Sequence, residues 1–352
     1  MDMDRLVTRA SKWMEGTGPQ GDVVLTSRIR LARNIKGLPF PHLLQEEKLR
    51  ELIQQVFKAV SSKSVTKTFG PMELLQLDTL SPLQKQILVE KHLISPALAE
   101  MDRPRAVILN SDESVSIMVN EEDHLRIQLL LPALQLHETW RMANVLDDAL
   151  EETLDYAFDE SLGYLTTCPT NVGTGLRASL MVHLPALVMS KQAGKILNAL
   201  SHVGLAVRGF YGEGTETAGN LFQISNQITL GLTEEEIINN LSSVAAQLID
   251  QEKAARQALL KDYGRQLEDK VFRAYGILSH ARIISSDEAL SILSHLRLGI
   301  DLGLIKEVDS RILNELMVLI QPAMLQGKYG RQMSPYERDL KRAEAIQDKL
   351  KK

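Results

Sequence analysis

Two hydrophobic patterns divide the chain at about residue 232. Before that point, residues 114–120 alternate apolar and polar side chains, which predicts a half-buried strand, and residues 106–110, 126–131 and 179–184 also favour strands. Residues 46–60 and 142–158 repeat apolar positions every three or four residues, which predicts amphipathic helices. A short helix and a Gly/Pro-rich linker are expected in residues 1–20. This part of the chain is therefore predicted to mix strands and helices.

After residue 232 the strand pattern almost disappears. Three capping boxes, each a Ser or Thr followed three residues later by Glu, mark helix starts at Thr233, Ser285 and Ser334. The last of them places Pro335 at the first helical position, where proline is best tolerated. We expect an α+β fold with three parts. An N-terminal segment (1–20) is followed by a domain with an antiparallel sheet flanked by helices (21–254), and an all-α domain (255–352) comes last.

Composition excludes several classes of protein. The 352 residues carry 40 basic and 45 acidic side chains, a net charge of −5, which argues against a dedicated nucleic-acid binder. No window approaches the roughly 20 apolar residues that cross a membrane, and the N-terminus lacks the apolar stretch of a secretory signal. Cys168 is the only cysteine, which suits a reducing compartment. We expect a cytoplasmic protein without direct contact to nucleic acid or membrane.

Common nucleotide motifs are missing. The chain has neither a GxxxxGK[ST] phosphate loop nor the HRD and DFG motifs of protein kinases. Residues 173–178, GTGLRA, match a dinucleotide fingerprint, but no apolar strand precedes them and no acid follows at 195–200, so we reject that match. The eight histidines lack the spacing of metal ligands, and no protein-held metal is predicted.

Charged residues gather in a few short segments. The run NEEDHLR (120–126) crowds three carboxylates and a histidine, which indicates either a solvated surface or a site for a cation. Arg28 and Arg30 are two residues apart, so an extended chain would point both to one face. Arginine forks bind phosphate oxygens well, although a single arginine is more often a surface ion-pair former. The hypothesis of a phosphate site depends on their combination with arginines farther along the chain.

Four motifs in order carry a resemblance to a known family. SRIRLARN, NEEDHLRI, CPTNVGTGLRAS and RGFYGEGTE closely resemble the phosphagen (guanidino) kinases, and CPTN-x-GT is the signature of that family. The resemblance covers about residues 21–254 and corresponds to the catalytic domain of arginine and creatine kinases. Those kinases carry a helical domain of about a hundred residues before this region, whereas about 20 residues precede it here. The helical tail instead resembles the bacterial protein-arginine kinases of the family.

The resemblance implies a site for ATP with Mg²⁺ held mainly by phosphates and water. Glu122 and Glu213 match the carboxylates that orient the guanidinium and accept its proton, and Cys168 would contact the guanidinium as a thiolate. Met181 replaces a usual histidine, which leaves open whether His183 takes its role. The implied ATP-binding set is Ser27, Arg28, Ile29, Arg30, Leu31, His92, Arg126, Arg177, Ala178, Ser179, Leu180, Met181, Arg208, Gly209, Phe210, Tyr211 and Gly212.

The tail holds a second candidate site. Arg338, Asp339, Arg342 and Ala343 resemble the RDxxRA phosphoarginine-binding motif of the protein-arginine kinases, which implies allosteric activation by phosphoarginine. On spacing alone an ordinary solvated helix face is favoured, because Glu337 and Lys341 neighbour the motif. The resemblance further implies stress-response partners: a CtsR-type repressor as substrate, an activator protein and the ClpC/ClpP protease. Apolar stripes on the tail helices are compatible with a homodimer.

The expected reaction is therefore ATP + protein L-arginine → ADP + protein N-phospho-L-arginine. Two alternatives stay open. One is a kinase for free arginine or a creatine-type compound. The other is an adaptor without catalytic activity that recognises phosphoarginine through the tail.

Overall fold

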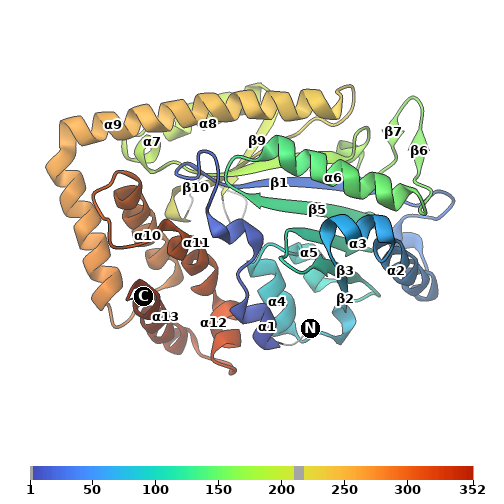
Figure 1. Ribbon diagram of the computed structural model, residues 1–352, viewed down its shortest axis with the longest axis horizontal. Helices are drawn as coiled ribbons and strands as arrows, with labels where there is room; N and C mark the ends of the chain where they lie inside the picture. The colour runs from blue at the N-terminus through green and yellow to red at the C-terminus, as the bar shows by residue number, and fades with distance from the viewer. Residues whose placement is uncertain (1–2, 210–217, 352) are drawn as a thin grey trace.

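An eight-stranded antiparallel sheet forms the centre of the computed structural model, which describes residues 3–209 and 218–351 (Figure 1). The strand order is β2-β3-β4-β5-β1-β8-β10-β9, and β6 and β7 form a separate hairpin. This arrangement confirms the predicted α+β class. The strands are β1 (Val24–Arg33), β2 (Met72–Gln76), β3 (Ala106–Asn110), β4 (Val115–Val119), β5 (Leu125–Pro132), β6 (Phe158–Asp159), β7 (Gly163–Tyr164), β8 (Leu176–His183), β9 (Leu205–Gly209) and β10 (Leu221–Asn226).

The two faces of the central strand β1 have opposite character. Side chains alternate along a strand, so Ile29 and Leu31 point to one face and Arg28 and Arg30 to the other. β1 pairs with β5 and β8, and its register places Arg30 opposite Arg177 of β8. The sheet therefore offers one apolar face and one face on which arginines from neighbouring strands lie close together.

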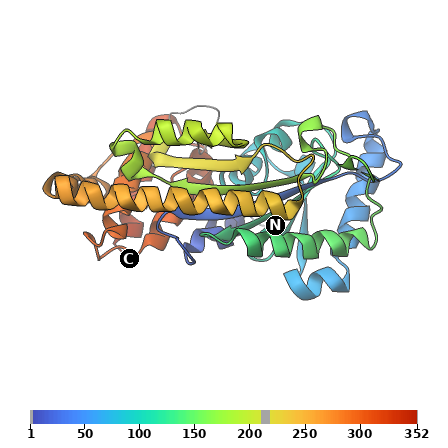
Figure 2. The same cartoon turned by 90° about the horizontal axis from the view of Figure 1, so that it is seen from above.

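Two helices cover the apolar face. α6 (Leu136–Glu151) packs against β1 and β5, and the first half of α9 (Glu234–His280) packs against β8 and β10 (Figure 2). Leu146 and Ile237 from these helices share the main hydrophobic core with Ile29. The predicted capping box at Thr233 is present and starts α9, which is kinked at Tyr263.

Helices alone follow β10 in the part of the chain that the structure describes. α10 (Ser286–Asp301) and α13 (Pro335–Leu350) pack against α9 (Figure 1). α11 (Ser310–Leu319) packs against α10 and α13, and α12 (Pro322–Lys328) against α13 and α4. Their core includes Leu25, Met181 and Leu221 of the sheet, so the helical tail is joined to the arginine-bearing face by apolar contacts. The predicted division at residue 254 lies within α9 and stays a prediction.

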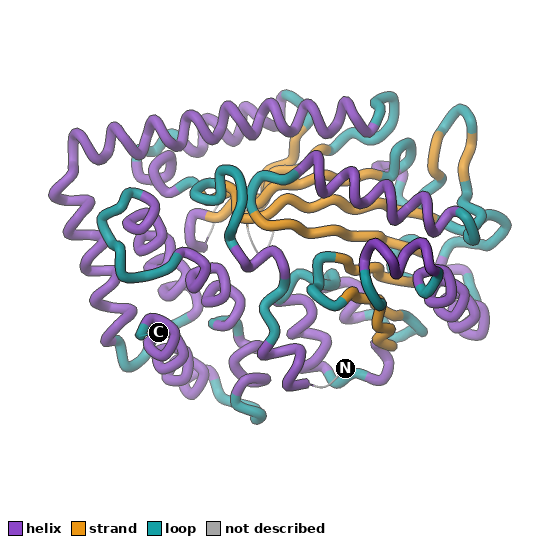
Figure 3. The backbone as a smooth tube through the Cα atoms, viewed as in Figure 1, coloured by secondary structure: helices purple, strands orange, loops and turns teal. Residues whose placement is uncertain are grey.

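The N-terminal segment lies between the tail and the catalytic part. It consists of α1 (Met3–Thr8) and a 3₁₀ turn, η1 (Lys12–Glu15), and runs beside α12 and α4 (Pro82–Glu90), as the tube in Figure 3 shows. Leu6 and Trp13 are fully buried there in a third apolar cluster that also contains Met324 of α12. This segment therefore helps to hold the tail in place.

Sequence patterns located the main strands of the sheet centre and several of the longer helices. The helix predicted at 46–60 is α2 (Glu46–Val60), and the strand predicted at 106–110 is β3. The helix predicted at 142–158 was wrong at both ends, because α6 begins at Leu136 and ends at Glu151; Leu154 and Tyr156 continue the apolar pattern from a loop that enters the core. The remaining elements are η2 (Pro41–Leu43), α3 (Lys63–Phe69), η3 (Leu77–Thr79), α5 (Pro96–Glu100), η4 (Pro169–Asn171), α7 (Pro185–Met189), α8 (Ala193–His202) and η5 (Ala218–Asn220).

Candidate active site

A cavity of about 270 Å³ opens on the arginine-bearing face of the sheet. Arg28 and Arg30 of β1, Arg126 of β5 and Arg208 of β9 line it, although these residues lie up to 180 positions apart along the chain. None of the lining residues that the structure describes carries a carboxylate. The sheet register thus gathers guanidinium groups from three strands around one space.

No described residue of the cavity lining is an acid that could compensate these arginines; Arg126 alone of the four pairs with described acids, Glu121 and Glu122, which are not part of the lining. Among the described residues, Arg28 donates to two neutral groups, Ser179 Oγ at 3.2 Å and Gln223 Oε1 at 2.7 Å. Burial, together with the nearby charges of Arg126 and Arg177, lowers the pKa of Arg28 to about 10. Burial and the charge of Arg28 also hold the pKa of Arg30 well below its usual value. Concentrated positive charge of this kind favours a polyanion.

Arg177 extends the cluster towards the family signature. Burial lowers the pKa of Arg177, as do the charges of Arg208 and Arg126, whereas Cys168 acts in the opposite direction. Cys168 is therefore close enough to Arg177 to interact with it. The thiol is half-buried, with its Sγ 3.1 Å from Thr170 Oγ1.

The two glutamates of the NEEDHLR segment, Glu121 and Glu122, differ in their exposure to solvent. Arg126 lies 2.6 Å from Glu121 Oε2 and 3.7 Å from Glu122 Oε2, measured from its terminal nitrogens. The Glu121 side chain is 3% exposed and also accepts a hydrogen bond from Ser95, whereas Glu122 is 40% exposed. Glu122 is therefore the carboxylate of this pair that an incoming substrate can reach.

Glu122 has an electrostatic environment that suits a base. Burial raises the pKa of its carboxyl, and the charge of Asp123 raises it further, while Arg126 acts in the opposite direction. A carboxylate whose pKa is raised accepts a proton more readily than an ordinary exposed one.

Asp123 and His124 serve the scaffold. Asp123 Oδ1 accepts hydrogen bonds from Asn34 Nδ2 and from the Thr167 backbone N–H, each at 2.7 Å. Thr167 Oγ1 donates to the Glu122 carbonyl at 2.8 Å. His124 Nδ1 accepts from the backbone N–H of Ile35. The first, second and third motifs are thereby tied together, and Glu122 is held close to the segment that carries Cys168.

His92 lines the cavity from the α4 side, as the resemblance implied. Burial lowers its pKa to about 3, and Arg28 contributes, so the imidazole is neutral at physiological pH. Its backbone is in the left-handed region, with φ of 61°, and its ring packs edge-on against Trp13 at 5.8 Å between centroids. The neutral ring adds a flat polar surface to a strongly cationic space.

Several residues that were predicted to bind nucleotide do not direct their side chains into this cavity. Ile29, Leu31, Ala178 and Leu180 belong to the core on the opposite face, so a contact with nucleotide would involve their backbone. Ser27 Oγ donates to the Ala133 carbonyl at 2.8 Å. Met181 packs into the core of the tail, and His183 Nε2 lies 2.8 Å from Ser294 Oγ of α10, where it meets the tail instead of the cavity. Their roles in binding stay predictions.

The fourth motif is described only at its start. Arg208 and Gly209 end β9, and Gly209 reaches the cavity lining. Phe210, Tyr211, Gly212 and Glu213 lie outside the described residues.

Sequence reasoning missed the neutral part of the lining. Gln128, Gln223 and Ser95 face the cavity together with apolar Val89, Ile94 and Met118. Gln128 Nε2 donates to the His92 carbonyl at 2.8 Å and so fixes the backbone of that residue. A signal was available, because Gln128 lies two positions after Arg126 in an otherwise apolar strand and must share its face.

The candidate phosphoarginine motif is only partly accessible. Arg342 is 1% exposed and donates to the carbonyls of Ile320 and Ile284 at 2.8 and 2.9 Å, in addition to its ion pair with Asp339. Arg338 and Asp339 are half-buried, and Ala343 is buried in the tail core. Arg338 and Asp339 are thus the members that a ligand can reach.

No group of three or more His, Cys, Asp or Glu side chains in the described ranges has the arrangement of a metal site. Within those same ranges, no helix is both long and apolar enough to cross a membrane.

Comparisons with known proteins agree with this geometry. The family described as ATP:guanido phosphotransferase, C-terminal catalytic domain, matches residues 51–255, and the protein-arginine kinase McsB C-terminal domain matches residues 264–352. A protein-arginine kinase of Moorella thermoacetica is 59% identical over 97% of this chain and 98% of its own length. One from Desulforamulus reducens is 56% identical over 97% of this chain and 95% of its own.

Solved structures show the same fold. A lombricine kinase is 26% identical with a TM-score of 0.58, and the match covers 73% of this chain and 72% of that one. A duplicated taurocyamine kinase from Schistosoma mansoni is 24% identical with a TM-score of 0.60, covering 72% of this chain and 35% of that longer protein. Taken with the near-full-length relatives, these matches establish that the chain belongs to the ATP:guanido phosphotransferase family, within its group of protein-arginine kinases.

Proposed function

We propose that this chain transfers the γ-phosphoryl group of ATP to the guanidinium group of arginine side chains in proteins, giving N-phospho-L-arginine. The observation that carries the proposal is the juxtaposition of an arginine-lined cavity with Glu122, an accessible carboxylate at its edge. The cavity suits the phosphates of a nucleotide, and the carboxylate suits a cationic acceptor.

The arginines bind the phosphates and stabilise the charge that spreads over the transferring group, which is the main contribution of proteins to phosphoryl transfer. Mg²⁺ would add further charge neutralisation on the phosphates. Since the described lining contains no carboxylate, phosphate oxygens and water would hold this hard cation, in accord with its reluctance to lose water. His92 contacts the nucleotide from the α4 side.

The acceptor guanidinium arrives protonated, because its pKa lies above about 12. As its nitrogen forms the new N–P bond, the bond between the γ-phosphorus and the bridging oxygen of ADP breaks, and one proton must leave the guanidinium. Glu122 accepts that proton, helped by a pKa that burial raises. Glu213 and Cys168 are assigned by family resemblance to orient the same guanidinium, and orientation lowers the barrier substantially.

An arginine side chain of a protein is preferred over a free guanidino compound as the acceptor. The preference rests on relatives at 52–59% identity that are named protein-arginine kinases and match nearly the full chain. The alternative, a kinase for a small guanidino compound, is favoured only by the fold shared with lombricine kinase at lower identity. A phosphoarginine-reading adaptor without catalysis would leave the arginine cavity unused.

One assay separates these possibilities. The chain is incubated with MgATP and either an arginine-rich protein or free L-arginine, and products are analysed by mass spectrometry without acid, because phosphoarginine is acid-labile. We expect phosphoarginine on the protein, ADP release that depends on the protein, and loss of both in Glu122→Gln. Glu138→Gln, an exposed α6 residue paired with Arg141, is the matched control. ADP release with free arginine alone would favour the small-molecule kinase, and no ADP release would favour the adaptor.

The wider role follows from the same resemblance. We propose that phosphoarginine marks proteins for the ClpC/ClpP protease, that a CtsR-type stress repressor is a substrate and that an activator protein assists. We also propose cytoplasmic location, a homodimer formed through the tail, and activation by phosphoarginine bound at Arg338 and Asp339. Stimulation of the initial rate by added phosphoarginine, and its absence in Asp339→Ala, would support the last of these; an equal rate would reject it.

A further inference from the structure

Gln223 is a neutral residue among the arginines of the sheet face. It lies on β10, and the register of the sheet places it directly opposite Arg208 of β9. Its neighbours Phe222 and Ile224 belong to the core, so alternation directs Gln223 to the opposite face, where it lines the arginine-rich cavity. Arg28 reaches it from β1 across the intervening strand β8. Gln223 therefore adjoins two of the arginines that line the cavity.

The side chains of Gln223 and Ser179 hold the Arg28 guanidinium at two points. Arg28 Nη2 donates to Gln223 Oε1 at 2.7 Å, and Arg28 Nε donates to Ser179 Oγ at 3.2 Å. Two bonds fix the direction of the whole fork, because the guanidinium is planar and rigid. Among the described residues, the third nitrogen, Nη1, makes no hydrogen bond. The guanidinium is thus oriented while part of its donor capacity stays open to a ligand.

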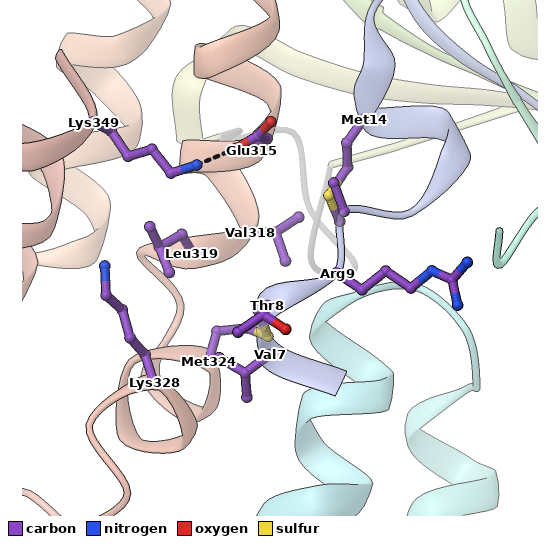
Figure 4. Close-up of a pocket in the computed structure, with 11 residues that line it drawn as sticks. Val7, Thr8, Arg9, Met14, Glu315, Val318, Leu319, Met324, Lys328 and Lys349 are labelled. Atoms are coloured by element: carbon purple, nitrogen blue, oxygen red, sulfur yellow. Dashed lines mark hydrogen bonds and ion pairs between the residues drawn. The ribbon is translucent and has the colours of Figure 1, made fainter. Parts of the chain in front are cut away.

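Other cations of the protein have a carboxylate as their partner. Arg33 Nη2 lies 2.7 Å from Asp147 Oδ2. In a second cavity, of about 210 Å³ between the N-terminal segment and the helical tail, Lys349 is paired with Glu315 (Figure 4). A carboxylate in place of the amide at position 223 would offset the charge of Arg28 in the same way, before any ligand arrives. The amide supplies an acceptor without that charge.

We propose that Gln223 is a positioning residue for the nucleotide phosphates: its neutral carbonyl oxygen orients Arg28 without compensating the charge of that guanidinium. This inference rests on the proposed function, which assigns the phosphates to the arginine-lined cavity. The amide contributes two separate properties, a hydrogen-bond acceptor and the absence of charge. Each can be removed without the other, because glutamate and methionine are close to glutamine in size.

Gln223→Glu keeps an acceptor for Arg28 and adds a negative charge. The carboxylate competes with the phosphates for Arg28 and Arg208, so we expect the dissociation constant for ADP, measured by calorimetry, to rise about 10- to 100-fold. The midpoint of thermal unfolding without ligand should rise in the same variant, because a desolvated guanidinium gains a partner of opposite charge. Gln76→Glu, the same change on the edge strand β2 far from β10, is the control and should leave ADP affinity unchanged.

Gln223→Met removes the acceptor and stays neutral. Arg28 keeps its charge and loses one of its two anchors, so the dissociation constant for ADP should rise about three- to tenfold, and the thermal midpoint should fall. Weaker ADP binding in both variants, with opposite shifts of the thermal midpoint, is the pattern expected for a positioning role. Ordinary damage to the fold would lower the midpoint in both variants, and that result would overturn the proposal.

A double-mutant cycle tests whether Gln223 acts through Arg28. In an Arg28→Met background, Gln223→Met should change the ADP dissociation constant less than about twofold. A further loss as large as in the wild-type background, or wild-type affinity in Gln223→Glu, would overturn the positioning role and leave the proposed function in place. Absence of ADP binding to the wild-type protein would instead overturn the nucleotide site of the proposed function, and the positioning role with it.

Discussion

Glu90 accepts the backbone N–H of Met324 at 2.8 Å, across 234 positions of sequence. Its other carboxyl oxygen accepts the N–H of Ala323 at 2.9 Å, so one carboxylate at the end of α4 satisfies two otherwise unpaired donors in the first turn of α12. Glu90 as a whole is 5% exposed. The contact joins the catalytic part to the helical tail at a point two residues from His92.

Burial makes this contact sensitive to pH. The pKa of Glu90 is raised from 4.5 to about 7 by burial, and the two N–H bonds oppose that shift without cancelling it. Between these values the folded chain binds more protons than the unfolded chain, so the free energy of unfolding falls as pH rises. Relative to Glu90→Gln, the wild type should lose about 2–3 kcal/mol between pH 4.5 and 7. Urea unfolding of both proteins across this range measures the difference, and parallel curves would contradict it.

Two arginines of strand β1 should respond in opposite ways to the same substitution. Arg33 lies 2.7 Å from Asp147 and its guanidinium lies 3.5 Å from the centroid of the Tyr164 ring. Arg33→Met leaves Asp147 buried without its partner and should destabilise the fold by about 3–5 kcal/mol, while nucleotide affinity of the folded protein is kept.

Arg28→Met removes a cation whose hydrogen-bond partners among residues 3–209 and 218–351 are neutral and whose charged neighbours there are arginines. The unliganded protein should gain about 1 kcal/mol of stability, and affinity for ADP should fall about 10- to 100-fold, as expected for lost bonds to a charged group. Thermal unfolding and calorimetry of both variants provide the measurement. Loss of stability in Arg28→Met, with affinity unchanged, would mean that Arg28 is structural and the cavity is not the phosphate site.

The motif at residues 27–34 shows which features of the site the sequence predicts and which it does not. Alternation correctly placed Arg28 and Arg30 on one face of a strand, because a period of two is a local property of extended chain. The same motif gave no sign that Arg33 is buried in an ion pair, since its partner Asp147 lies on α6, 114 residues away. Which charge is structural and which is free for a ligand depends on such distant neighbours.

The signature at residues 168–174 shows that backbone contacts between distant segments are equally hard to predict from sequence. Gly173 has a φ of 108°, which residues with a side chain rarely adopt, and a Cβ at this position would come within 2.3 Å of the Thr229 carbonyl oxygen. Family resemblance identified this segment, but its register against Thr229 is a tertiary relationship. Asp123 and Thr167 likewise have no sequence signal that distinguishes them as supports for Glu122.

Thr167 is expected to position Glu122. Its hydroxyl donates to the Glu122 carbonyl at 2.8 Å, and Thr167→Val removes this bond with little change in volume. We expect the turnover number to fall about tenfold, because small displacements of a catalytic carboxylate are costly, while the affinity for ADP stays the same. Thr153→Val, which removes a hydroxyl bond at the end of α6, is the control. An equal loss of ADP affinity would indicate general damage to the fold instead of a positioning role.

Substitution of the two arginines of the tail motif, Arg338 and Arg342, should affect stability to different extents. Arg342 is almost fully buried and bonds two backbone carbonyls, so Arg342→Met leaves the carbonyls of Ile320 and Ile284 without their donor and should lower stability by about 2–4 kcal/mol. Arg338 is half-buried and donates to the Met333 carbonyl at 3.0 Å, so Arg338→Met should cost less than about 1 kcal/mol. If phosphoarginine binds this helix, Arg338→Met should weaken its binding in calorimetry without loss of fold. Unchanged affinity in Arg338→Met would show that the motif's arginines serve tail packing, because the buried member alone could not present its charge to a ligand.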